Sequence, residues 1–385
     1  LPWTELEGQE LIVDGFLGNV VSGATRALRR RYLQRQREEK ILAKDLEKLR
    51  DVPCITPDGF PFSLWVNTGL RQDTLLSLKS GAGAVGLYRT EMPFSLRSSF
   101  PTEDEQIGIY REQLLAFAPR TVTMRTLDIG GDKDLPYFPI EEENPFLGWR
   151  GIRISLDHPE IFLVQIRAML RASEGVNNLR IMLPMISSIP ELDRALELID
   201  RAYRELTEEE GYSMQMPPVG AMIEVPAAVY QVKEIGRRVD FLSVGTNDLT
   251  QYLLAVDRNN PRVADLYSSL HPSVLRALKS IHEQAKSVNC QLSVCGEMAG
   301  DPLQAVVLMG LGYENLSMSA SSLLRVKSVL LNVSHKQAQD LVRRALRMPN
   351  AGSIARFMAD ALNHPEVARL ISLTNQSYAR DSSNS

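Results

Sequence analysis

A (β/α)8 barrel of the TIM type, preceded by a long linker helix, is the α/β fold that the residue pattern predicts. After residue 53, short apolar runs rich in β-branched residues alternate with longer amphipathic stretches, which is typical of βα units around a parallel sheet. Eight such runs occur over about 300 residues, the usual size of a closed barrel. An open, doubly wound sheet would show the same alternation and is the structural alternative.

Two segments, residues 1–23 and 24–52, precede the predicted barrel. The first has apolar runs broken by glycines and is too short to fold alone, so we interpret it as the remnant of a further domain. The second contains no glycine or proline, and its leucines recur at roughly helical spacing, which predicts a long helix. Between Ala24 and Arg50 it carries ten basic and four acidic residues. A charge run of this kind is usually a solvated helix face and less often a nucleic-acid site.

The predicted barrel covers residues 53–365. Its eight strands, in chain order, are predicted at residues 63–69, 84–91, 122–129, 179–186, 219–226, 241–249, 292–300 and 314–320. The connections after the third and sixth strands are longer than one helix requires and contain residues 141–153 and 250–263, where barrels carry functional insertions. Residues 366–385 are predicted to form a polar C-terminal tail.

Composition and charge exclude several classes of protein. The net charge is −4, with 43 Lys and Arg against 47 Asp and Glu, so a nucleic-acid partner, which requires a basic surface, is not expected. No stretch of eighteen apolar residues is present and the acidic start has no signal-peptide pattern, so we expect no membrane segment. Three cysteines are too few for a disulfide framework. These features predict a cytoplasmic location.

Charged residues follow several predicted strands at their carboxyl ends, where a barrel has its active site. Arg89 and Arg125 belong to the second and third strands, and Arg150 and Arg258 lie in the two long connections. A guanidinium group matches phosphate or carboxylate and stays charged at any working pH. A single arginine of this kind is more often part of a surface ion pair. Four at one rim, however, predict a multiply charged, phosphorylated ligand.

Two acids and one thiol are further candidates at this rim. Glu224 and Asp248 follow adjacent strands, and such hard oxygen ligands suit Mg²⁺ or Mn²⁺. Each acid could instead pair with an arginine, or the two could act as general acid and base. Cys295 ends the seventh strand, where a thiol can face the cavity, although a free cysteine is more often a small buried hydrophobe. The turn 128–133 resembles a phosphate-binding glycine loop without the spacing of a nucleotide fingerprint.

Six sequence motifs occur together and in order, namely GLYRTE (86–91), RTLDIGGDK (125–133), ENPFLGWRGIR (143–153), AMIEVPAA (221–228), SVGTNDLTQYLLAVDR (243–258) and CGEMAGD (295–301). They resemble the motifs of the phosphoenolpyruvate (PEP)-utilising enzyme family, and the resemblance covers roughly residues 10–365. Within the family they are most similar to the C-terminal PEP-binding domain of Enzyme I of the PEP-dependent phosphotransferase system. Segments such as RTEMPF and SMSASS resemble its nitrogen-related paralogue.

The resemblance implies which residues bind the substrate. Arg89, Arg125 and Arg258 would hold the PEP phosphate, with Arg150 nearby, and Asn247 would contact PEP through its amide. The physical chemistry agrees with these roles, because phosphoryl transfer needs dense positive charge around the phosphate oxygens and little covalent help.

The same resemblance implies a metal and a proton donor. Glu224 and Asp248 would bind Mg²⁺, which would stabilise the developing enolate. Cys295 would protonate C3 of that enolate to give pyruvate.

The resemblance also implies partners. Enzyme I accepts the phosphoryl group on a histidine of an N-terminal swivelling domain and passes it to an HPr-like phosphocarrier protein. Residues 1–23 would be the end of that phosphohistidine domain, so this chain alone would not complete the transfer, and a homodimer is expected. Two alternatives stay open, a Mg²⁺-dependent lyase or mutase acting on pyruvate or PEP, and a non-catalytic PEP sensor that changes its oligomeric state.

Overall fold

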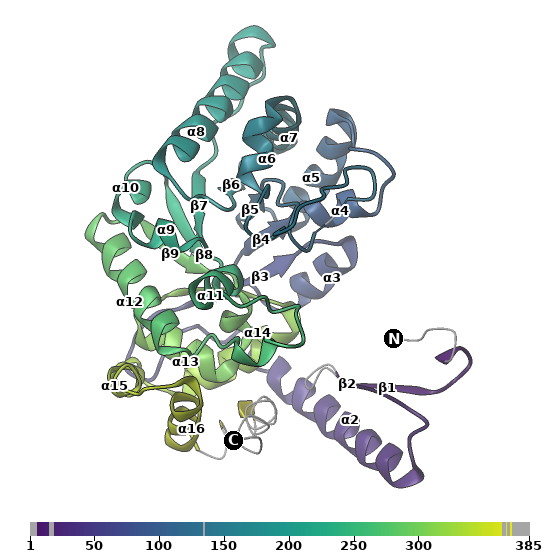
Figure 1. Ribbon diagram of the computed structural model, residues 1–385, viewed down its shortest axis with the longest axis vertical. Helices are drawn as coiled ribbons and strands as arrows, with labels where there is room; N and C mark the ends of the chain where they lie inside the picture. The colour runs from purple at the N-terminus through teal and green to yellow at the C-terminus, as the bar shows by residue number, and fades with distance from the viewer. Residues whose placement is uncertain (1–5, 15–18, 134, 364–366, 368–369, 372–385) are drawn as a thin grey trace.

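Eight parallel strands form a closed barrel in the computed structural model of this protein, which describes residues 6–14, 19–133, 135–363, 367 and 370–371 (Figure 1). The strands are β3 (Ser63–Thr68), β4 (Val85–Arg89), β5 (Val122–Arg125), β6 (Leu179–Leu183), β7 (Val219–Ile223), β8 (Phe241–Val244), β9 (Gln291–Val294) and β10 (Asn315–Met318). Strand β10 pairs in parallel with β3 and closes the barrel. The predicted barrel is therefore confirmed, and the open-sheet alternative is excluded. Most of the predicted tail, residues 366–385, and parts of residues 1–23 lie outside the described residues.

Helices surround the barrel on its outside, as Figure 1 shows. Those that connect the strands are α3 (Arg71–Lys79), α4 (Glu91–Ser95), α5 (Glu103–Phe117), α6 (Ile152–Asp157), α7 (Pro159–Ser173), α8 (Ile189–Arg204), η1 (Glu205–Glu209), α9 (Pro226–Val229), α10 (Val232–Gly236), α11 (Thr246–Leu254), η2 (Ala264–Leu266), α12 (Pro272–Ser287), η3 (Glu297–Gly300) and α13 (Pro302–Gly310). After the last strand follow α14 (Ala320–Asn332), α15 (His335–Ala345) and α16 (Ala351–Ala361). The longer helices repeat their apolar residues at helical spacing because only one face packs on the strands. Within the described part of the chain, no helix is long and apolar enough to cross a membrane.

An antiparallel hairpin and a long helix precede the barrel. The hairpin consists of β1 (Leu11–Asp14) and β2 (Asn19–Ser22), and α2 (Arg26–Glu47) occupies the position of the predicted linker helix. In Figure 1 the hairpin and the first turns of α2 extend away from the barrel. Towards the end of α2, Leu42 and Leu46 are buried in the main apolar core. The helix therefore packs on the barrel near its C-terminus, and its N-terminal half forms ion pairs with the hairpin through Arg29 and Arg35.

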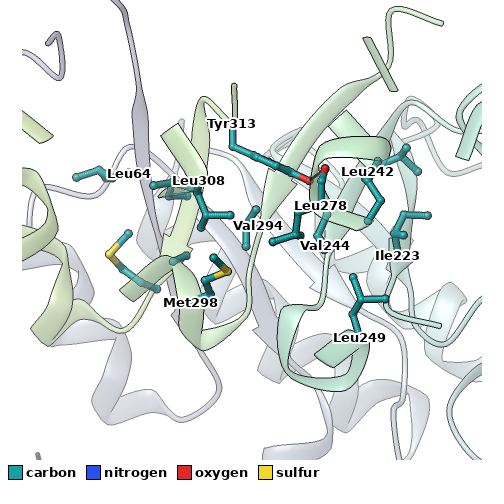
Figure 2. Packing of buried hydrophobic residues seen from close by; sticks show 14 of the residues in the cluster. Leu64, Ile223, Leu242, Val244, Leu249, Leu278, Val294, Met298, Leu308 and Tyr313 are labelled. Atoms are coloured by element: carbon teal, nitrogen blue, oxygen red, sulfur yellow. Dashed lines mark hydrogen bonds between the residues drawn. The ribbon is translucent and has the colours of Figure 1, made fainter. Parts of the chain in front are cut away.

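Buried apolar residues lie on both sides of the barrel strands. The larger core fills the space between the strands and the helices, and Figure 2 shows the part of it around β8, β9 and α13. In this part Tyr313 donates its hydroxyl to the carbonyl of Leu278 at 2.8 Å, so its polar end is satisfied inside the core. Along the strands, residues of a smaller core alternate with residues of the larger core, so the smaller core lies inside the barrel. Its members are Leu87, Met182, Met222, Phe241 and Cys295.

The strands end earlier than predicted. The sixth predicted strand, residues 241–249, ends at Val244 in β8, and α11 begins two residues later. The predicted connection 250–263 accordingly begins inside this helix. Gly245 permits the sharp turn, because a Cβ atom there would lie 2.5 Å from Oε2 of Glu224. Polar candidate residues therefore lie in short turns after the strands rather than within them.

Replacing Leu308 by alanine tests the larger core. Leu308 on α13 is fully buried, and truncating such a leucine removes burial and leaves a cavity. We expect Leu308→Ala to lower the free energy of unfolding by about 2–5 kcal/mol in urea denaturation. Leu115→Ala is the matched control, because Leu115 is 55% exposed, and it should change this free energy by less than about 0.5 kcal/mol. Equal losses in the two variants would contradict the assigned packing.

Candidate active site

Strand alternation brings three charged side chains into the mouth of the barrel. Leu87 and Met222 belong to the inner core, and Arg89 and Glu224 follow them by two residues on the same face, one layer nearer to the carboxyl end. Arg125 also faces inward, because its Nη1 atom lies 3.9 Å from Sδ of Met222. All three residues therefore lie at the carboxyl ends of the strands, where the sequence analysis expected them.

The carboxylate of Asp128 is the centre of a buried charge cluster. Asp128 is fully buried and pairs with Nη1 of Arg125 at 2.8 Å, with Nε of Arg150 at 3.4 Å and with Nζ of Lys133. Arg125 pairs in addition with Glu91. Burial disfavours the charged form of Asp128, but the three cations outweigh it and hold the pKa of this carboxyl well below its usual range. Asp128 therefore stays charged at neutral pH although it is buried.

Arg150 connects this cluster to the turn after β8. The side chain is fully buried, and Nη1 and Nη2 each donate to one carboxylate oxygen of Asp248 at 3.1 Å. Nη1 also donates to the hydroxyl of Tyr252 at 3.2 Å, and Tyr252 donates to the carbonyl of Phe146. Such a two-pronged ion pair is strong and directional. Of the alternatives left open for the two acids, pairing with an arginine is observed for Asp248.

Glu224 is held differently from Asp248. Its Oε1 atom accepts the backbone N–H of Met185 at 2.7 Å, whereas Oε2 is buried and has no hydrogen-bond partner among the described residues. Burial, together with the charges of Asp248 and Asp128, raises the pKa of Glu224 to about 7. A buried polar atom without a partner is costly. Oε2 therefore marks a position where a cation or a proton would be stabilised.

The thiol of Cys295 lies at the top of the inner core. Its S–H group donates to the carbonyl of Val244 at 3.7 Å. Burial raises the pKa of the thiol to about 11, although a hydrogen bond from Ser243 partly offsets this effect. The charges of Glu224 and Arg125 act on the same group. Cys295 is therefore both a buried hydrophobe and a thiol that stays protonated at neutral pH.

A cavity of about 1200 Å³ lies at the carboxyl ends of the strands, and of the predicted site residues Arg89 and Asn247 line it, together with Glu297. The other predicted site residues, Arg125, Arg150, Glu224, Asp248, Arg258 and Cys295, are not among its lining residues. Arg89 is exposed and has no ion-pair partner in the part of the chain that the structure describes. The amide oxygen of Asn247 accepts the backbone N–H of Glu297 at 2.9 Å. Arg258 is partly exposed and pairs with Asp132 at 3.4 Å. Arg89 and Arg258 are therefore accessible to a ligand, unlike the buried arginines of the cluster.

Sequence reasoning missed two residues that complete this arrangement. Tyr252 follows Asp248 by four residues on α11, and helical spacing alone could have placed both on one face towards Arg150. Ser243 follows Phe241 by two residues on β8, and strand alternation could have placed it inside the barrel beneath Cys295. The helical spacing of Tyr252 and the strand alternation of Ser243 can both be read from the sequence. Neither residue is charged, however, and the search for site residues relied on charged side chains at strand ends.

The fit of Mg²⁺ to this site depends on Glu224 and Asp248. Among the described residues, no group of three or more His, Cys, Asp or Glu side chains could hold a metal ion. Mg²⁺, however, usually takes only one or two carboxylates and completes its shell with water and substrate oxygens. The unpartnered Oε2 atom of Glu224 fits such a ligand. Both oxygens of Asp248 accept from Arg150 but retain lone pairs, so the two acids fit a magnesium ion shared with a substrate.

Comparison with known proteins identifies the family of this barrel. The family described as PEP-utilising enzyme, PEP-binding domain, matches residues 43–335, a range that contains all eight barrel strands. This match confirms the family resemblance predicted from the six sequence motifs.

Characterised relatives match most of this chain. It is 46% identical over 366 residues to the phosphoenolpyruvate-dependent phosphotransferase system protein of Salmonella typhimurium, covering 95% of this chain and 49% of that protein. The figures for the protein of the same name from Escherichia coli are identical. The phosphoenolpyruvate-protein phosphotransferase of Haemophilus influenzae is 42% identical over 319 residues, covering 83% of this chain and 55% of that protein. The chain thus spans about half the length of these curated relatives.

Neutralising Asp128 tests the charge cluster. Asp128→Asn removes the acid that Arg125, Arg150 and Lys133 share, and breaking a buried ion pair typically costs about 3–5 kcal/mol. We expect that loss in the free energy of unfolding at neutral pH. Because the folded pKa of Asp128 is lowered, its contribution is present above the unfolded pKa of about 4 and is lost as the pH falls through the folded pKa. The difference in the free energy of unfolding between wild type and Asp128→Asn should therefore shrink below about pH 4 in denaturant titrations.

Asp132→Asn is the matched control for this prediction. Asp132 lies in the same turn but is a quarter exposed, and it pairs with Arg258 and accepts a hydrogen bond from the amide of Asn259 near the surface. Its loss should therefore cost less than about 1 kcal/mol. A difference between wild type and Asp128→Asn that does not change with pH would contradict the ion-pair assignment.

Proposed function

Because this chain belongs to the PEP-utilising enzyme family, of which it carries the PEP-binding domain, we propose that it is the catalytic domain of a PEP-protein phosphotransferase of the Enzyme I type. In the proposed reaction the bond between phosphorus and the enol oxygen of PEP breaks and the phosphoryl group moves to a histidine outside this barrel. The enolate that leaves is protonated at C3 and becomes pyruvate. The observation that carries the proposal is the family match over the whole barrel.

The arginines of the mouth would share the charge of PEP between them. Arg89 lines the cavity, and Arg258 is partly exposed and pairs with Asp132. Both side chains would close on the phosphate. Arg125 and Arg150 are held by acids before any substrate arrives, so their positive charge needs no reorganisation during the transfer. Asn247, whose amide oxygen is already engaged, would offer its NH₂ group to PEP.

Glu224 and Asp248 would hold Mg²⁺. When bound, the ion supplies Lewis acidity that favours negative charge on the enolate oxygen. The residues themselves contribute a buried acceptor without a partner, Oε2 of Glu224, and an acid already oriented by Arg150.

Cys295 would act as the acid that ends the reaction. Its raised pKa keeps the proton on sulfur at neutral pH, and Cys295 directly follows the carboxyl end of β9. Transfer of the S–H proton to C3 leaves the electron pair on sulfur as a thiolate and completes pyruvate.

The acceptor histidine would belong to another part of the protein or to another chain. The described histidines, His158, His271, His282 and His335, do not line the cavity at the barrel mouth. We therefore propose a separate phosphohistidine domain, an HPr-like phosphocarrier as the next acceptor, a homodimer and a cytoplasmic setting. The nitrogen-related branch stays a prediction from the RTEMPF and SMSASS segments.

Calorimetric titration tests the proposed substrate and metal together. The wild-type chain should bind PEP in the presence of Mg²⁺ and bind it much more weakly without the ion. Glu224→Gln should weaken the Mg²⁺-dependent binding by at least about tenfold, because the variant loses a charged oxygen ligand and keeps its shape.

The matched control is Glu297→Gln, which neutralises an exposed acid of the same cavity and should leave PEP affinity unchanged. Binding of PEP that does not depend on Mg²⁺ would contradict the metal role. Absence of PEP binding in the wild type would contradict the proposed function itself.

Radiolabelled PEP tests the position of the acceptor. We expect no phosphohistidine on this chain after incubation with PEP and Mg²⁺, because the described histidines lie away from the cavity. The full-length relative from Haemophilus influenzae serves as the positive control. A labelled histidine located by mass spectrometry in this chain would overturn the proposed separate acceptor.

A further inference from the structure

The side chain of Asn67 reaches across the inside of the barrel to the turn that carries Cys295. Leu64 and Val66 of β3 belong to the larger core, so strand alternation places Asn67 on the inner face. Its Nδ2 atom donates to the backbone carbonyl of Cys295 at 3.0 Å. Strand β10 lies between β3 and β9 in the barrel order, so this hydrogen bond spans a whole strand. Asn67 thus joins the carboxyl ends of β3 and β9.

The contact lies where the backbone pairing of β9 with β10 has ended. The last residue of β9 that pairs with β10 is Val294, one residue before Cys295. On the other side, the backbone N–H of Cys295 donates to the carbonyl of Val244 in β8 at 3.1 Å. The backbone of Cys295 is therefore held by β8 through its N–H group and by the Asn67 side chain through its carbonyl group.

The amide of Asn67 is fully engaged inside the protein. Besides its bond to Cys295, Nδ2 donates to the backbone carbonyl of Ser317 at 3.4 Å, and Oδ1 accepts the hydroxyl of Ser317 at 2.6 Å. Both carbonyls can only accept, so the nitrogen must face them and the amide has one orientation. A primary amide has two hydrogens, and both are committed to these carbonyls. Asn67 lines the cavity, but its donors serve the protein and not a ligand.

A glycine on β4 makes room for this arrangement. A Cβ atom at Gly86 would lie 2.4 Å from Oγ of Ser317. Ser317 is fully buried, so its hydroxyl is confined between Gly86 and the amide of Asn67. A side chain locked by packing and hydrogen bonds holds its neighbour more precisely than a mobile one.

We propose that Asn67 is a positioning residue for the proton transfer from Cys295, because it holds the backbone carbonyl of Cys295 and so fixes the turn that carries the thiol. This inference rests on the proposed function. In that reaction the S–H bond breaks and leaves its electron pair on sulfur, while the electron pair of the enolate forms the new C–H bond at C3. Misplacing a reacting group by about 1 Å can slow a reaction by about a hundredfold.

Exchange of the methyl protons of pyruvate for deuterium tests this role, because the Cys295 thiolate would take the proton from C3 in the reverse step. The rate is measured by NMR at several pyruvate concentrations with Mg²⁺ present. Asn67→Ala should lower the maximal rate by at least roughly tenfold and leave the half-saturating pyruvate concentration unchanged. An unchanged maximal rate would overturn the proposal. So would a raised half-saturating concentration, which would make Asn67 a ligand contact.

Asn315→Ala is the matched control. Asn315 on β10 also donates Nδ2 to a backbone carbonyl of β9, that of Leu292, at 3.0 Å. Leu292 lies near the start of β9, three residues before Cys295. The control variant therefore loses the same kind of hydrogen bond away from the thiol and should keep the maximal exchange rate of the wild type. Equal slowing in Asn67→Ala and Asn315→Ala would overturn the proposal, because general loosening of β9 would then explain both.

Site-resolved alkylation by iodoacetamide, followed by mass spectrometry, tests the contact without any substrate. Cys295 is only 3% exposed, so the reagent reaches its sulfur when the turn opens. Asn67→Ala should speed the alkylation of Cys295 relative to that of Cys290 by roughly tenfold, the effect of losing one hydrogen bond. Cys290, directly before β9, reports on loosening of the whole protein. An unchanged ratio in Asn67→Ala, or the same rise in Asn315→Ala, would overturn the proposal.

The two measurements separate this inference from the function on which it rests. Absence of pyruvate exchange in the wild type would contradict the proposed function, and the alkylation ratios would still decide whether Asn67 holds Cys295. Exchange that persists in Cys295→Ala would overturn the inference, since no proton transfer from this thiol would remain to be positioned. If Asn67→Ala does not fold, Asn67→Ser makes the same comparison, because its hydroxyl can meet Ser317 but is too short to reach the carbonyl of Cys295.

Discussion

A carboxylate with three cationic neighbours, Asp128, holds the mouth of this barrel together. It follows strand β5, yet it binds Arg150 from the long connection after that strand, and Arg150 reaches on to Asp248 at the start of α11. One guanidinium group thus joins two connections that are far apart in sequence. Arginine suits this position because its planar group offers five donors in a fixed geometry, whereas lysine offers a single charged point.

The arginines of the charge cluster are paired with acids, whereas one carboxylate oxygen at its edge has no partner among the described residues. Arg125 and Arg150 face acids within hydrogen-bond distance, so the low polarity of the interior strengthens these pairs. Glu224 lies at the edge of the same cluster with one oxygen unpartnered. Burial favours the neutral form both of Glu224 and of the nearby thiol of Cys295. The mouth thus contains fixed positive charge and two groups whose charged forms require a ligand or a donor.

Much of this fold could be predicted from the sequence, because parallel strands buried on both faces form apolar runs that are easy to recognise. The ends of the strands could not be predicted, since residues 245–249, predicted as the end of a strand, belong to a turn and a helix. Strand ends correctly located Arg89, Arg125 and Glu224. The partner of Arg150, by contrast, lies 98 residues away, and no local pattern determines which acid a buried arginine meets.

The division between buried and accessible arginines has a chemical consequence. A substrate phosphate would encounter arginines that acids already orient in the folded protein. Little free energy would therefore be needed to arrange this positive charge when the ligand binds. Arg89, in contrast, is exposed and must lose side-chain freedom when a ligand binds. The ordering of Arg89 therefore depends on the ligand, while that of Arg125 depends only on Asp128 and Glu91.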